Sequence, residues 1–140
     1  MISNTEKYAL RAAIRLARHH REGPIQAGVL AREAGIPSNY LSKVLHTLAR
    51  HGVVQSERGR NGGFRLAQDP DHLPLRELLA PFAPESGRVG CLLRRGDCSD
   101  EDPCPAHGHW KGARQMVADF FAHTTLGDVV AGGLDGSMES

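Results

Sequence analysis

The sequence predicts a mainly α-helical fold: a winged helix-turn-helix with a small β-hairpin wing, followed by a long C-terminal dimerisation helix. Two short segments with helical apolar spacing, residues 26–36 and 39–51, are separated by a glycine turn. Two short β-like runs then flank the basic stretch RGRNGG at 58–63, and apolar residues recur at helical spacing after Pro105. With 140 residues, of which 40% are hydrophobic, the chain is about one domain long and can bury a core.

A first amphipathic helix is expected over residues 6–20, with Asn4 or Thr5 as its cap. The helix at 39–51 should bury one row of side chains: Tyr40, Leu41, Val44, Leu45 and Leu48. Its opposite face then carries hydrogen-bonding and cationic side chains: Asn39, Ser42, Lys43, His46, Thr47 and Arg50. Side chains of these kinds reach base edges and phosphates when such a helix enters a DNA groove.

The β-like runs at residues 53–57 and 63–67 form the predicted wing, with Asn61-Gly62 as a hairpin signal because both residues tolerate positive φ. Arginines at its tip suit a narrow minor groove. The region between residues 38 and 66 has a local charge of +4, from five cations (Lys43, Arg50, Arg58, Arg60, Arg65) and one anion (Glu57). The predicted contacts to double-stranded operator DNA are Ser38, Asn39, Tyr40, Ser42, Lys43, Thr47, Arg50, Arg58, Arg60, Asn61 and Gly62. The rival interpretation is a solvated helix face beside an ordinary hairpin turn.

A fourth helix is expected over residues 74–80, ended by Pro81, and a long helix from Pro105 to about residue 123. The apolar stripe of the long helix exceeds what one small winged domain needs, so it predicts either dimer packing or core packing. The expected interface residues are Trp110, Ala113, Val117, Phe120 and Phe121, with Met116 as a further candidate. The predicted division is a DNA-binding domain at 1–82, a cofactor-binding loop at 83–104, the dimerisation helix and a short terminal helix at 105–131, and a disordered tail at 132–140.

The three cysteines, Cys91, Cys98 and Cys104, all lie in the stretch CLLRRGDCSDEDPCPAHGHW. The apolar run at residues 9–17 contains two arginines and is neither a signal-peptide core nor a membrane span, so a cytoplasmic location without a membrane partner is expected. In that reducing compartment a disulfide framework is disfavoured. Gaps of six and five residues lack the tight knuckle of compact zinc sites. Spacing alone leaves three interpretations, in order of preference: an iron–sulphur cluster, zinc, and a thiol switch.

His107 follows Cys104 by three residues, so both side chains can project from one face of the predicted helix. His109 is the rival nitrogen ligand, although it points to another face. No residue that would orient a catalytic histidine and no oxyanion site can be named, so the sequence does not predict an enzyme.

The run RGRNGGFRLA, the three-cysteine loop, CPAHGHW and the closing TTLGDVV together resemble the IscR/NsrR/RirA group of bacterial winged-helix regulators. The resemblance extends over nearly the whole chain, from NTEKYALRAAIRLA to TTLGDVV. It implies a homodimer joined by the long helix and a repressor whose DNA binding depends on an iron–sulphur cluster. By motif, and closest to the IscR-like branch, the ligands would be Cys91, Cys98, Cys104 and His107. A 2Fe-2S cluster is then favoured, with 4Fe-4S second and zinc third. The alternative is a zinc- or thiol-redox-responsive regulator with the same DNA-binding half.

Overall fold

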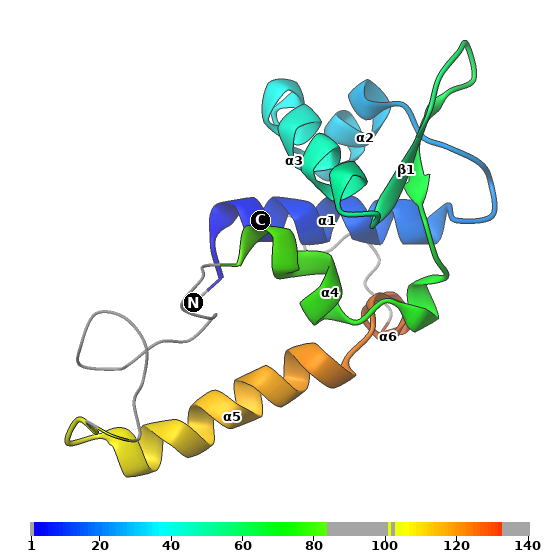
Figure 1. Ribbon diagram of the computed structural model, residues 1–140. Coiled ribbons are helices and arrows are strands. Elements are labelled where there is room, and N and C mark those ends of the chain that lie inside the picture. Colours follow the sequence, from blue (N-terminus) through cyan, green and yellow to red (C-terminus); the bar gives the residue numbers. More distant parts are fainter. Residues whose placement is uncertain (1, 84–100, 102, 133–140) are drawn as a thin grey trace.

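The computed structural model describes residues 2–83, 101 and 103–132, which form a helical body carrying a two-stranded wing (Figure 1). The elements in chain order are α1 (Asn4–Arg18), α2 (Ala27–Ala34), α3 (Ser38–Arg50), β1 (Val54–Glu57), β2 (Gly63–Leu66), the 3-10 helix η1 (Pro70–His72), α4 (Leu75–Leu79), the 3-10 helix η2 (Ala80–Phe82), α5 (His107–His123) and α6 (Leu126–Ala131). The predicted fold class, a mainly α winged helix-turn-helix with a small hairpin wing, is therefore confirmed.

Helix α1 begins with a capping box formed by Ser3 and Glu6. The Ser3 hydroxyl accepts a hydrogen bond from the Glu6 amide at 3.1 Å, and the Glu6 carboxylate accepts one from the Ser3 amide at 3.0 Å. This reciprocal pair satisfies amides that the first helical turn leaves without partners. The prediction of Asn4 or Thr5 as the cap is wrong, because Ser3 is the hydroxyl residue that stands three positions before a glutamate.

Helices α2 and α3 form the helix-turn-helix, and the turn between them uses Gly35 at φ 68°. That left-handed conformation favours glycine, as the sequence indicated. The buried row of α3 consists of Leu41, Val44, Leu45 and Leu48. Tyr40, which was predicted to join this row, is instead 37% exposed. At 3.6 residues per turn Tyr40 falls at the edge of the apolar stripe, where the stripe meets solvent.

The wing is an antiparallel hairpin in which Val54 pairs with Leu66 and Glu57 pairs with Gly63. The predicted Asn61-Gly62 turn at positive φ is wrong: the glycines with positive φ in this hairpin are Gly59 (109°) and Gly63 (147°). Gly62 is needed for a different reason, because a Cβ atom there would lie 2.2 Å from the Glu57 carbonyl oxygen. The hairpin therefore closes through a five-residue tip instead of a two-residue turn.

The C-terminal part returns to the body through α6. The Leu126 amide donates to the Leu73 carbonyl at 2.8 Å, and the Leu75 amide donates to the Thr124 carbonyl at 2.9 Å. Leu126 is fully buried and belongs to the same core as the leucines of α3 and α4. Helix α5, by contrast, has no buried residue and runs beside the body from this attachment point (Figure 1).

Two of the predicted boundaries shift. Helix α5 begins at His107 and not at Pro105, because residues 105 and 106 form a turn in which the His107 amide donates to the Cys104 carbonyl at 3.0 Å. Helix α4 ends at Leu79, and Pro81 lies in the 3-10 turn that follows. The domain limits at 82, 104 and 131 stay predictions, and the predicted disordered tail lies outside the described residues except for Gly132.

Across the described part of the chain, no helix has both the length and the apolar character that crossing a bilayer requires.

Candidate nucleic-acid interface and cluster site

One row of α3 points away from the core. Asn39, Lys43, His46 and Arg50 follow one another at spacings of four, three and four residues, and all four are exposed. Such spacing places side chains on one helical face, here the face opposite Leu41, Leu45 and Leu48. Helix α3 therefore presents one amide, one imidazole and two cationic groups to any partner that approaches this face.

Ser42 and Thr47 flank this row and are half-buried. The Ser42 hydroxyl donates to the Ser38 carbonyl at 3.0 Å, and the Thr47 hydroxyl donates to the Lys43 carbonyl at 3.0 Å. Both hydroxyls are therefore engaged as donors within their own helix, although their oxygen lone pairs can still accept hydrogen bonds. Their reach toward DNA is shorter than the sequence suggested.

Tyr40 joins α3 to the start of α1. Its hydroxyl contacts the Thr5 hydroxyl, and its ring meets the Tyr8 ring edge-on, with centroids 5.1 Å apart and an interplanar angle of 72°. Edge-to-face geometry at this separation is favourable. Tyr40 was predicted as a DNA contact, and the structure adds a second role, because its ring and hydroxyl fix the beginning of the recognition helix against α1.

The wing tip carries Arg58, Arg60 and Asn61, all exposed, and it projects beyond the helical body (Figure 1). Gly62 is buried, and its amide donates to the Gly59 carbonyl at 3.1 Å. Between the two strands of the wing, Arg65 pairs with Glu57 at 2.9 Å. Because that pair cancels, the positive charge of the wing resides at its tip, where a phosphate-lined groove would attract it.

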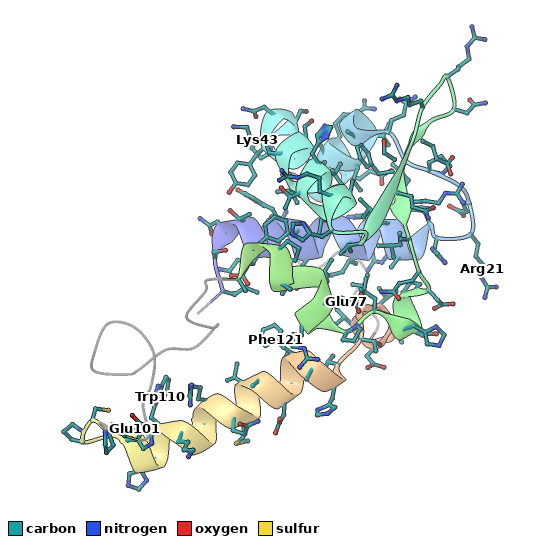
Figure 2. All side chains as sticks on the ribbon, viewed as in Figure 1. Arg21, Lys43, Glu77, Glu101, Trp110 and Phe121 are labelled. Carbon is teal, nitrogen blue, oxygen red and sulfur yellow. The ribbon has the colours of Figure 1, made fainter. Side chains whose placement is uncertain are left out.

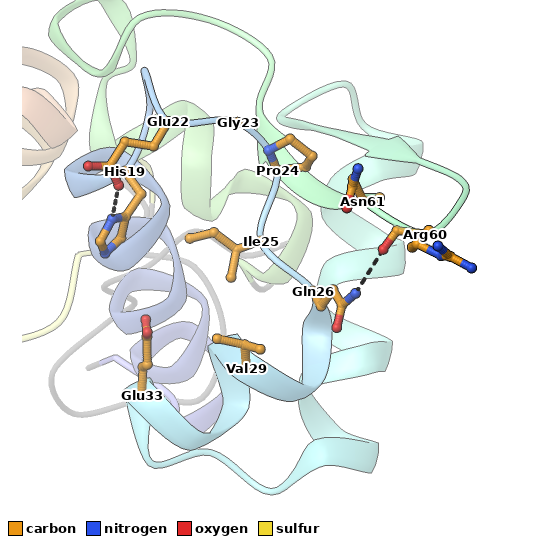
Figure 3. Close-up of a pocket in the computed structure, with 11 residues that line it drawn as sticks. His19, Glu22, Gly23, Pro24, Ile25, Gln26, Val29, Glu33, Arg60 and Asn61 are labelled. Atoms are coloured by element: carbon orange, nitrogen blue, oxygen red, sulfur yellow. Dashed lines mark hydrogen bonds and ion pairs between the residues drawn. The ribbon is translucent and has the colours of Figure 1, made fainter.

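A hollow of about 510 Å³ lies between the wing tip, the loop that joins α1 to α2, and the start of α2 (Figure 3). The Gln26 side-chain amide crosses it to donate to the Arg60 carbonyl at 3.3 Å. Glu22 and Glu33 also line it, and His19 pairs with Glu22 at 2.5 Å. Two carboxylates make the hollow a poor phosphate site.

The start of α5 brings together two of the four predicted cluster ligands. Cys104 is 6% exposed, His107 is half-buried, and the two are joined by the backbone hydrogen bond that precedes the helix. Glu101 and Trp110 lie at the same end of the helix (Figure 2). Cys91 and Cys98 fall outside the described residues. Within the described ranges, no group of three or more His, Cys, Asp or Glu side chains is placed to hold a metal ion.

The donor chemistry at this helix end fits an iron–sulphur cluster. A buried thiol and an imidazole one turn apart are ligand types that such clusters accept. Helix α5 has 17 residues and no side-chain cap at its N-terminus, so its first amides present a partial positive charge beside Cys104. His109, the rival ligand, is exposed on another side of α5.

The residues predicted for the dimer interface divide between two rows of α5. Trp110, Val117 and Phe121 are half-buried on one side, and Phe121 packs against the core of its own chain. Ala113, Met116 and Phe120 form the outward row, in which Met116 is 74% and Phe120 is 52% exposed. The sequence indicated a single apolar surface. In the structure it divides into a half-buried row on the side of Phe121 and an exposed apolar row that includes Met116 and Phe120.

A family model described as an iron-dependent transcriptional regulator, Rrf2, matches residues 2–132. The chain belongs to the Rrf2 family. An HTH-type transcriptional regulator of Aquifex aeolicus (strain VF5) is 34% identical over 132 residues, which cover 93% of this chain and 91% of that protein. The HTH-type transcriptional regulator IscR of Vibrio campbellii (strain ATCC BAA-1116) is 26% identical, with 92% and 76% covered.

Solved structures agree with this family membership. CymR of B. subtilis, described as the global cysteine regulator, superposes with a TM-score of 0.78 at 30% identity, covering 94% of this chain and 96% of that one. The T. potens IscR structure gives a TM-score of 0.77 at 22% identity and supports the fold alone. This Rrf2-family chain is a DNA-binding transcriptional regulator and not an enzyme.

Proposed function

We propose that this Rrf2-family regulator is a homodimeric repressor whose affinity for operator DNA is set by an iron–sulphur cluster. Cys91, Cys98, Cys104 and His107 would hold the cluster, with 2Fe-2S favoured over 4Fe-4S. The observation that carries the proposal is the buried thiol of Cys104 one turn before His107, at an uncapped helix start. The description of the family as iron-dependent supports iron over zinc.

The proposed DNA contacts are the predicted ones, divided into a central set and a bordering set. Asn39, Lys43 and Arg50 would enter the major groove from α3, and Arg58 and Arg60 would reach the adjacent minor groove from the wing tip. Ser38, Tyr40, Ser42, Thr47, Asn61 and Gly62 border these groups and would position the backbone or accept hydrogen bonds. A dimer carries two copies of the winged helix-turn-helix, so we expect an operator with two-fold symmetry.

The proposed coupling runs along α5. When bound, the cluster would supply a redox-active iron centre that depends on the availability of iron. Cys104 and His107 would hold it at one end of the helix, while the other end is fastened to the body by the hydrogen bonds of Leu75 and Leu126. Helix α4 starts at Leu75, and its leucines share the core with α3. A change in the position of α5 would therefore be transmitted through α4 to α3, the helix proposed to contact DNA. A two-state switch requires such a connection.

The second candidate is a zinc- or thiol-redox-responsive regulator without a cluster. It is favoured by the buried Cys104 thiol and by the likeness to CymR, which is named for cysteine and not for iron. The DNA-binding half is the same in both candidates, so only the chemistry at Cys104 separates them.

Purification without oxygen tests the two candidates. We expect visible absorbance with iron and sulphide in equal amounts, whereas a colourless protein with stoichiometric zinc would favour the second candidate. His107→Ala should weaken or shift the absorbance, because it removes the proposed nitrogen ligand. His109→Ala is the matched control, since His109 is an exposed imidazole two residues away, and its spectrum should stay that of the unaltered protein.

A further inference from the structure

Phe64 of β2 lies where the wing, the loop between α1 and α2, and helix α3 meet. Its amide donates to the Ile25 carbonyl at 2.8 Å, and its carbonyl accepts from the Ile25 amide at 2.9 Å. The loop between α1 and α2 thus pairs with β2 on the edge that β1 leaves open. Phe64 is half-buried and packs against the core. These contacts leave its ring little freedom to move.

The ring of Phe64 meets the ring of His46 on α3. The centroids are 6.2 Å apart and the planes are nearly perpendicular, at 85°. This is an edge-to-face contact within the favourable range of separations. His46 is nevertheless exposed, and it stands between Lys43 and Arg50 in the outward row of α3. Its imidazole therefore lies at the boundary between α3, the proposed recognition helix, and the wing, which we call the seam. One side of the ring contacts Phe64, and the other side faces solvent.

The shape of DNA determines what would lie over this seam. A helix in the major groove and a wing in the adjacent minor groove are separated by one sugar-phosphate backbone. That backbone must cross the protein between α3 and β2, which is where His46 is exposed. An imidazole N–H is a suitable donor to a phosphate oxygen, and contacts of this kind fix the register of a protein on the duplex.

We propose that His46 donates a hydrogen bond to the DNA backbone at this seam, and that Phe64 is the positioning residue that orients its ring. The inference rests on the proposed DNA-binding function and adds to it a contact that links recognition helix and wing. His46 was expected on the outward face of α3 but was not among the predicted contacts, and no role was expected for Phe64.

The test is a fluorescence anisotropy titration of the full chain with two duplexes: one selected from a random library by the unaltered protein, and one of scrambled sequence. His46→Ala should weaken binding to both by a similar factor of about three to ten, because a phosphate contact does not depend on sequence. His72→Ala is the matched control, since His72 is an exposed histidine on η1, and it should change neither affinity.

The Phe64→Leu variant tests whether Phe64 acts by orienting the His46 ring. It should weaken binding in the unaltered background but have almost no further effect once His46 is alanine, because the two residues then act through one contact. A purely structural role for Phe64 would weaken binding equally in both backgrounds and would overturn its assignment.

Unchanged affinity of the His46→Ala protein for both duplexes, or a loss of affinity for the selected duplex alone, would overturn the phosphate contact. Failure of the unaltered protein to bind either duplex would overturn the proposed function itself. The two failures are therefore distinguishable.

Discussion

At the scale of single residues, close backbone approaches shape the wing. Gly63 has a φ of 147°, and a Cβ atom added there would lie 2.3 Å from the Ile25 carbonyl oxygen. Both the conformation and the space require glycine. Since Gly63 precedes Phe64, the same approach sets the pairing between β2 and the α1–α2 loop on which the wing rests.

Gly63→Ala should therefore lower the free energy of unfolding by about 1–3 kcal/mol, because the side chain cannot be accommodated without moving backbone. Gly28→Ala is the matched control: Gly28 lies in α2 with open space around it, and alanine there should raise stability by about 0.5 kcal/mol. Chemical denaturation of both variants measures the difference. Equal stability of the two would contradict the backbone contact.

Residue-level detail is also where the sequence was least informative. A pattern such as RGRNGG indicates a turn, but it does not say which glycine takes the positive φ, since that depends on the approach of Ile25. Tyr40 shows the same limit: its place at the edge of the apolar stripe was ambiguous until Tyr8 and Thr5 were brought beside it. Contacts between residues far apart in sequence, such as His46 with Phe64, leave no local signal.

At the scale of elements, the sequence predicted every α-helix of the described residues to within a few residues. Helices α1 to α4 and α6 bury side chains in the same core, whereas α5 has no buried residue and was predicted from its apolar stripe. The helix-turn-helix is fastened to α1 by a contact that periodicity does not reveal. Arg11 of α1 donates through Nη2 to the Ala34 carbonyl at 2.6 Å, and its guanidinium lies 6.0 Å from the Tyr8 ring centroid. It thereby satisfies a carbonyl at the end of α2 that the helix leaves without a partner.

Arg11→Met should cost about 1–2 kcal/mol of stability, because methionine keeps the apolar stem but removes the donor to a half-buried carbonyl. Arg32→Met is the control, since Arg32 is exposed on α2, and its effect should stay within about 0.5 kcal/mol. Thermal or urea unfolding gives both values. A cost for Arg11→Met no larger than that of the control would mean that the Ala34 carbonyl finds another partner.

At the scale of the whole molecule, α5 is a helix with an apolar side that the described residues of the same chain leave exposed. Its outward row, Ala113, Met116 and Phe120, is apolar and exposed, while Phe121 of its inner row packs against the core. A second copy of the same helix would cover the outward row, in keeping with the proposed homodimer.

The sequence indicated an excess of apolar surface, but dividing it into two rows required knowing where α5 attaches. Half of the cluster ligand set, Cys91 and Cys98, lies outside the described residues, so that part of the site still rests on the sequence.

Phe120→Glu should convert the dimer to monomer at micromolar concentration, because it places a charge within the proposed apolar interface. Gln115→Glu adds the same charge on another side of α5, where Gln115 is exposed and bonds Asp119 at 2.9 Å, and it should leave the dimer intact. Sedimentation velocity distinguishes the two species. A dimeric Phe120→Glu protein would show that another surface joins the protomers.

The central claim is that cluster occupancy controls operator binding. The most direct measurement is the affinity of protein purified without oxygen for its selected operator duplex, before and after the cluster is removed from the same preparation. A coupling of the usual size for allosteric proteins predicts that the two dissociation constants differ by about 5- to 150-fold. Equal dissociation constants for the two forms at every tested operator would contradict the account.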